Sequence, residues 1–272
     1  MRVLVCADAH ADLPALEAVL KAGSDVDRKV FLGDAITYGP HPKECLDLVV
    51  KEFDVVLAGN HDLAVAQMSA PPAAGKTGDG YEWDWWTRER LAPSDMTLIK
   101  GLPQCADEEW DGKRVHLAHQ PRNCADRPGR PAGLKAGHAG PADRRNSPPA
   151  DRQIPSPGRY MMPDIADNEL LERIKGMPGE IIFVAHAHRQ MDRRVNGRRV
   201  INPGSIGQQR DGNPRASYAI FGCGRIEFFR VDYDIARTIS DVRALPLRKE
   251  FIACWCAFIE QGIVDMSRVP PR

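Results

Sequence analysis

The sequence lacks an excess of charge of either sign, because its 37 Lys and Arg residues balance 37 Asp and Glu residues. A chain without net charge gives no electrostatic reason to expect nucleic acid or an anionic membrane as the main partner. The sequence also lacks long apolar runs. No stretch approaches the roughly 18 apolar residues of a membrane span, and the run at 3–7 is too short for the apolar part of a signal peptide. We therefore expect a soluble, cytoplasmic protein.

The sequence has no CxxC pair, and its 7 cysteines are scattered along the chain. An odd, scattered set argues against a disulfide framework and favours a reducing compartment. The spacing of Cys254 and Cys256 allows a metal or redox role, but burial as small apolar side chains is the favoured interpretation. Hydrophobic residues make up 43% of the 272 residues, which is enough for the core of one large α/β domain.

The first 62 residues alternate short apolar runs with amphipathic stretches. Such a rhythm is typical of strands and helices that follow one another in a mostly parallel sheet. Asp12 is placed to cap the first helix and Gly23 to end it. The expected strands are 3–7, 30–32 and 55–58, and the expected helices are 13–22 and 42–52.

The later part of the chain has more signals of antiparallel pairing. Asn196-Gly197 and the segment 222–224 each separate two strand-like runs, which predicts two hairpins over 193–201 and 216–231. Trp83 and Trp86 share one face of an expected helix, which predicts core packing. Further strands are expected at 114–118 and 181–185, and further helices at 81–91, 94–100 and 234–244.

One segment shows neither helical nor strand period. Residues 121–158 are rich in Pro, Gly, Ala and Arg, and they offer too little apolar surface to offset the entropy of ordering. We expect a flexible surface insertion there, within a domain that covers 1–246. The basic excess of this insertion could contact an anionic partner, although a solvated loop is the favoured interpretation. The tail at 247–272 receives no structural prediction.

Five short segments carry the residues that suggest chemistry, and each follows an expected strand. Because the carboxyl ends of parallel strands form the ligand crevice of α/β sheets, segments far apart in sequence can meet there. In a regular strand, residues two apart face the same side, as Asp8 and His10 would, or His186 and His188. The five segments are Asp8-Ala9-His10, Gly33-Asp34, Gly59-Asn60-His61-Asp62, His119 and His186-Ala187-His188.

Each segment alone also has an ordinary interpretation. Gly-Asp and Gly-Asn pairs are common in turns, and a lone histidine such as His119 or His116 is more often structural. The conjunction is more specific, because carboxylate, amide oxygen and imidazole ligands together suit first-row divalent ions. Without cysteine in the set, a structural zinc cluster is disfavoured. Asp34 has two oxygens with which to bridge two ions, and ions about 3.5–4 Å apart can activate a shared water and hold a phosphoryl group.

In this order the segments resemble the calcineurin-like metallophosphoesterases. Further motifs resemble the small bacterial and archaeal phosphodiesterases of that superfamily: Leu32-Gly33-Asp34, Tyr38-Gly39-Pro40, Asn202-Pro203-Gly204-Ser205 and Arg210-Asp211-Gly212. The resemblance covers roughly residues 1–120 and 160–245. It implies an α/β fold, a two-sheet sandwich flanked by helices in four αββα layers.

The resemblance also implies roles for individual residues. A metal-bridging hydroxide would be the nucleophile of a phosphoesterase, with a phosphodiesterase as the favoured interpretation and a small phosphoester of nucleotide-like form as substrate. His61 would contact the phosphate or protonate the leaving oxygen, and Asp62 would orient His61. The ions would be Mn²⁺ or Fe, with Zn²⁺, Ni²⁺ or Mg²⁺ as alternatives. One ion would be held by Asp8, His10, Asp34 and His188, and the other by Asp34, Asn60, His119 and His186.

The sequence departs from the family pattern near two of these residues. Ala185 stands where relatives usually have Gly, and it would strain the turn if that position needs a positive φ. Gln120 also replaces a usual Gly, and the 121–158 insertion follows at once. These departures keep open a non-catalytic scaffold of the same fold. Among enzymes, a protein phosphatase and a dinucleoside-polyphosphate hydrolase remain alternatives.

Overall fold

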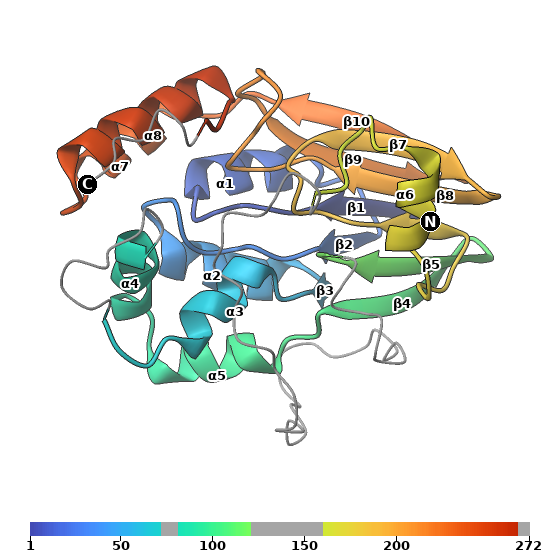
Figure 1. The fold of residues 1–272 in the computed structure, drawn as a ribbon, viewed down its shortest axis with the longest axis horizontal. Helices are drawn as coiled ribbons and strands as arrows, with labels where there is room; N and C mark the ends of the chain where they lie inside the picture. The colour runs from blue at the N-terminus through green and yellow to red at the C-terminus, as the bar shows by residue number, and fades with distance from the viewer. Residues whose placement is uncertain (72–80, 121–159, 266–272) are drawn as a thin grey trace.

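The computed structural model describes residues 1–71, 81–120 and 160–265 (Figure 1). The insertion predicted at 121–158 therefore lies outside the described residues. Among the helices that are described, none has the length and apolarity needed to cross a membrane.

The described strands form two five-stranded mixed sheets. In the first sheet the order is β10-β9-β1-β2-β3, in which β1, β2 and β3 run parallel and β9 runs antiparallel to β1. Val5 pairs with Val30 on one side and with Ala219 on the other, which places β1 at the centre. The strands are β1 (Arg2–Cys6), β2 (Arg28–Phe31), β3 (Val55–Val56), β9 (Ala216–Gly222) and β10 (Arg225–Val231).

The second sheet has the order β4-β5-β6-β8-β7. Its three central strands are parallel and its two outer strands are antiparallel. Both predicted hairpins are confirmed, since β7 pairs with β8 around Asn196-Gly197 and β9 pairs with β10 around 222–224. The strands are β4 (Cys105–Trp110), β5 (Lys113–Ala118), β6 (Ile181–Phe183), β7 (Gln190–Val195) and β8 (Arg198–Pro203).

The helices at 13–22 and 42–52 begin where Asp12 and Pro42 predict. The Oδ1 atom of Asp12 accepts the N–H of Ala15 at 3.2 Å, and Gly23 ends the helix. These contacts confirm the predicted start and end of α1. The helices are α1 (Leu13–Ala22), α2 (Pro42–Glu52), α3 (Asn60–Gln67), α4 (Tyr81–Glu89), α5 (Pro93–Gly101), α6 (Asp167–Arg173), α7 (Ile235–Arg243) and α8 (Lys249–Gln261).

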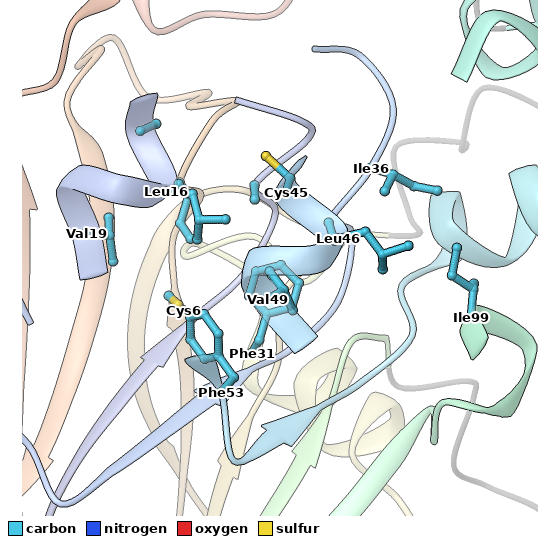
Figure 2. Close-up of a cluster of buried hydrophobic side chains, with 14 of the residues drawn as sticks. Cys6, Leu16, Val19, Phe31, Ile36, Cys45, Leu46, Val49, Phe53 and Ile99 are labelled. Carbon is cyan, nitrogen blue, oxygen red and sulfur yellow. The ribbon is translucent and has the colours of Figure 1, made fainter. Parts of the chain in front are cut away.

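Alternating side chains of the central strands fill two separate apolar layers. Val5 belongs to a cluster that also contains Leu117 and Phe183 of the second sheet, so the two sheets pack face to face. Cys6 points to the other face, where α1 and α2 cover the first sheet. Figure 2 shows this layer, with Leu16 of α1 and Val49 of α2 against the sheet. Residues of α6 cover the outer face of the second sheet, which completes the predicted αββα order.

A further apolar cluster joins α4, α7 and α8. Trp83 and Trp86 are both buried in it, which confirms their predicted core role. Cys256 is buried there as expected, and Cys254 packs at its edge. Helix α8 lies in the tail to which the sequence analysis assigned no structure, and in Figure 1 it lies beside α7 at the C-terminal end of the chain.

Candidate metal centre

Loops that follow five strands meet at one edge of the two sheets. Backbone hydrogen bonds join them directly: Asp8 N–H to Gly33 O at 3.0 Å, His10 N–H to Asp34 O at 3.1 Å and Ala185 N–H to His119 O at 3.1 Å. Gly59 lies so close to Asp34 that any side chain at position 59 would overlap its carboxylate. All five predicted segments are therefore brought together.

The turns that present these side chains are left-handed. Five of the seven candidate ligands have positive φ: Asp8 (55°), His10 (47°), Asp34 (60°), His186 (67°) and His188 (58°). Strand alternation is therefore not what aligns Asp8 with His10 or His186 with His188, and that part of the sequence argument was wrong. Non-glycine residues rarely adopt this conformation, and such strain concentrates at functional sites.

The first group of candidate ligands is Asp8, His10 and His188, all of them buried. The Nδ1 atom of His188 lies 2.6 Å from the carbonyl oxygen of Gln208, so Nδ1 carries the proton and donates it there. The Nε2 lone pair of His188 then faces inward, 3.5 Å from Asp8 Oδ1 and 3.4 Å from His10 Nε2. Three potential ligand atoms thus point at one place.

The second group is Asp34, His119 and His186. His119 Nδ1 lies 3.0 Å from the carbonyl oxygen of Leu32, which directs Nε2 toward Asp34 Oδ2 at 3.2 Å and Asn60 Oδ1 at 3.0 Å. Asp34 Oδ2 is also 3.9 Å from His10 Nε2 of the first group. The Asp34 carboxylate therefore lies between the two groups.

Burial and the Asp34 carboxylate act in opposite directions on the charged groups of this region. Burial raises the pKa of Asp8 to about 7, and burial lowers the pKa of His10 to about 3. Burial also opposes protonation of His119, but the neighbouring Asp34 carboxylate outweighs it and raises the His119 pKa to about 9. The Asp34 carboxylate thus stabilises positive charge beside it against the cost of burial.

The donor atoms fit a pair of divalent ions. Asp8 Oδ1 and Asp34 Oδ2 are buried without a hydrogen-bond partner among the described residues. Buried carboxylate oxygens without a donor are costly unless a cation satisfies them. Oxygen and imidazole ligands of this kind suit first-row divalent metals. The seven residues named by the sequence analysis all lie at these two groups, Asn60 through its contact with His119.

Comparisons with known proteins agree with this geometry. Residues 1–190 match the family model of the calcineurin-like phosphoesterases. The chain belongs to that family. It is a metal-dependent phosphoester hydrolase by descent, and the family implies that divalent metal ions bind it. The predicted family is therefore confirmed.

Individual relatives of this calcineurin-like phosphoesterase cover nearly the whole chain. A metallophosphoesterase from Sphaerobacter thermophilus is 28% identical, with a TM-score of 0.71 over 97% of this chain and 100% of that one. The uncharacterized protein MJ0912 from Methanocaldococcus jannaschii is 28% identical over 88% of this chain and 91% of its own. The hypothetical protein PH1004 from Pyrococcus horikoshii OT3 shares the fold, with a TM-score of 0.70, 18% identity and coverage of 93% and 97%.

Asp62 of this phosphoesterase has partners other than the expected one. Its carboxylate accepts four backbone N–H groups: Gly59 (2.9 Å), Asp34 (2.8 Å), Ala35 (2.9 Å) and Ile36 (3.2 Å). Asp62 thus caps α3 and ties that helix to the loop after β2. The expected contact with the His61 imidazole is absent from the hydrogen bonds of the described residues, so Asp62 positions the backbone rather than the ring.

His61 of the phosphoesterase is the second residue of α3 and is half-buried beside the first ligand group. Its N–H donates to Asp34 Oδ1 at 2.9 Å, and its ring lies 5.5 Å from that of His10. Tyr38, which was quoted only as part of a motif, packs edge-on against His61 at 5.0 Å. Trp255 of α8 stacks on Tyr38 and donates its Nε1–H to the Tyr38 carbonyl oxygen at 2.8 Å. Helix α8 therefore supports the wall of the site.

The departures from the family pattern have different consequences. Ala185 does not have a positive φ, so the strain expected there is absent and falls on His186 and His188 instead. Gln120 points into the second group: its Nε2 lies 2.6 Å from Asn60 Oδ1 and 3.1 Å from His186 Nδ1. His116 is remote from both groups, with Nδ1 2.6 Å from Asp107 Oδ1, as its structural interpretation predicted.

The end of β8 and the loop after it contain supporting residues to which the sequence analysis gave no role. Asn202 donates to the carbonyl oxygen of Ala185 at 2.9 Å and so holds the turn that carries His186. The hydroxyl of Ser205 donates to the carbonyl oxygen of Asp8 at 2.9 Å. The signal for both was the Asn202–Ser205 motif, but a motif alone does not reveal which backbone atoms its side chains bind.

Proposed function

We propose that the chain is a phosphodiesterase that uses two divalent metal ions to hydrolyse a phosphoester bond. The observation that carries this proposal is the shared carboxylate of Asp34, which lies between two groups of buried, inward-facing donor atoms. A single ion would leave one of these groups without a cation to satisfy it. The arrangement therefore favours a binuclear site over a mononuclear one.

In this proposal the first ion is held by Asp8, His10, Asp34 and His188. The second is held by Asp34, Asn60, His119 and His186. Two divalent ions supply Lewis acidity and a water of lowered pKa. The carbonyl oxygens of Leu32 and Gln208 fix the tautomers of His119 and His188, so that Nε2 of each ring stays available.

His61 supplies the proton for the leaving oxygen in this account. Its ring is half-buried and packs edge-on against the rings of both His10 and Tyr38. Asp62 contributes by holding the α3 N-terminus against the Asp34 loop, which sets the position of His61 through the backbone. A general acid must lie within hydrogen-bond reach of the oxygen that it protonates, and such placement makes that reach reproducible.

The preference for a small diester, nucleotide-like in form, rests on the motifs of the small phosphodiesterases, Tyr38-Gly39-Pro40 and Asn202–Ser205. Mn²⁺ or Fe ions are the metals that we propose. Manganese-loaded protein should cleave bis(p-nitrophenyl) phosphate faster than p-nitrophenyl phosphate or dinucleoside polyphosphates. A faster rate on monoesters would favour a protein phosphatase, and a faster rate on dinucleoside polyphosphates would favour their hydrolase.

The test of the proposal is metal analysis and an activity screen on the same preparation. Two ions per chain together with turnover of the diester are the expected result. No turnover with any divalent ion, and one ion or fewer per chain, would instead support a non-catalytic scaffold.

A further inference from the structure

Arg210 lies at the end of the loop that supports the first ligand group. This loop bonds to the segment after β1 through Ile206 N–H to Ala7 O at 3.0 Å and Gly207 N–H to Asp8 O at 3.0 Å. Two residues before Arg210, the carbonyl oxygen of Gln208 accepts the proton of His188. Arg210 is therefore joined to the first ligand group through the backbone of this loop.

The partners of the guanidinium are neutral. Its Nη2 donates to Gln208 Oε1 at 2.5 Å, and its Nη1 is 3.4 Å from the Tyr160 hydroxyl. Its Nε is buried and has no hydrogen-bond partner among the described residues. Within that same part of the chain no carboxylate pairs with Arg210, whereas Arg199 binds Asp192 and Arg230 binds Asp211. Arg210 thus keeps donors and charge available for an anion.

Tyr160 connects Arg210 to the second ligand group. Its ring stacks on the His186 ring, with centroids 4.7 Å apart and an interplanar angle of 22°. The Arg210 guanidinium lies 5.7 Å from the Tyr160 ring centroid. The Arg210 side chain therefore contacts one residue beside each ligand group. Gln208 binds His188 of the first group, and Tyr160 stacks on His186 of the second.

We propose that Arg210, which Gln208 and Tyr160 hold in position, binds a non-bridging oxygen of the substrate phosphoryl group. This inference rests on the proposed function and adds a specific anion-binding residue to it. The planar guanidinium can donate two parallel hydrogen bonds to phosphate oxygens, which fixes the orientation of the phosphoryl group as well as its charge. A lysine ammonium would supply the charge but not the two parallel N–H donors.

Binding of inorganic phosphate tests the inference without requiring turnover. Calorimetry on manganese-loaded wild type, Arg210→Ala and Arg210→Lys should show phosphate binding weakened about 10- to 100-fold in the alanine variant. The lysine variant should fall between the two. In diester hydrolysis, Arg210→Ala should mainly raise KM, with metal content unchanged. Arg225→Ala removes the same charge from the exposed first residue of β10 and is the matched control.

The outcomes separate the inference from the proposed function. Phosphate affinity in Arg210→Ala and Arg210→Lys equal to that of wild type would overturn the role of Arg210, whether or not the wild type is active. Weaker phosphate binding in these variants, in a protein that shows no turnover, would support Arg210 as an anion ligand and reject the enzyme. If Arg210→Ala fails to fold, the intermediate affinity expected of Arg210→Lys decides in its place.

Discussion

The two ligand groups differ in how firmly the chain holds them. In the first group Asp8, His10 and His188 are all buried, and the Gln208 carbonyl fixes the His188 ring. In the second group His119 is fixed in the same way by Leu32, but His186 is half-buried and its ring contacts the side chains of Gln120 and Tyr160. Preorganised ligands lose less freedom when an ion binds. We therefore expect the first group to bind its ion more tightly than the second.

The substitution with the largest expected effect removes what the groups share. Asp34→Asn keeps the shape of the side chain but removes the charge that faces both His119 and His10. Loss of several kcal/mol of charge stabilisation should lower turnover by about 10³-fold or more. Metal analysis should find that both ions bind more weakly. Asp107→Asn, beside His116 and away from the centre, is the control. Two tightly held ions in Asp34→Asn would mean that the groups are independent.

A pair of histidine substitutions compares the groups directly. His188→Ala and His186→Ala should each leave one ion per chain, because each removes a ligand from one group only. The ion that remains in His186→Ala should be the tighter of the two, since it occupies the fully buried first group. Calorimetric titration with Mn²⁺ measures both affinities. Equal residual affinities in the two variants would remove the proposed difference between the groups.

A smaller effect is expected from a residue that only supports the second group. Asn202→Ala removes the hydrogen bond to the Ala185 carbonyl oxygen and loosens the turn that carries His186. Loss of such a supporting contact typically costs about 10-fold in metal affinity, and here the loss should fall on the weaker ion. Asn213→Ala, which removes a hydrogen bond from Arg215 N–H in the loop before β9, is the control. An equal loss at both ions would show that the Asn202 loop supports the whole centre.

The sequence could predict those elements whose ends and apolar pattern are local. Helices α1 and α2 were predicted with their observed bounds, because Asp12, Gly23 and Pro42 mark their ends and an apolar stripe runs between. The convergence of the five segments followed from the order of strands alone. Strand β4 was missed because Asp107, Glu108 and Glu109 interrupt any alternating pattern, and it depends on pairing with β5.

What could not be predicted depends on long-range backbone contacts. The left-handed turns at Asp8 and His186 arise from hydrogen bonds to loops distant in sequence, so local periodicity gave no sign of them. Helix α3 begins at Asn60 within a run that resembles a turn, and the four amides bound by Asp62 come from two separate loops. The contact of Arg210 with Tyr160 joins residues 50 positions apart.

Anomalous diffraction from crystals of the manganese-loaded protein would test the central claim most directly. We predict two peaks, one among Asp8, His10 and His188 and the other among Asn60, His119 and His186, with Asp34 in contact with both. A single peak, or a pair of peaks of which one lies away from these residues, would contradict a binuclear centre built on Asp34.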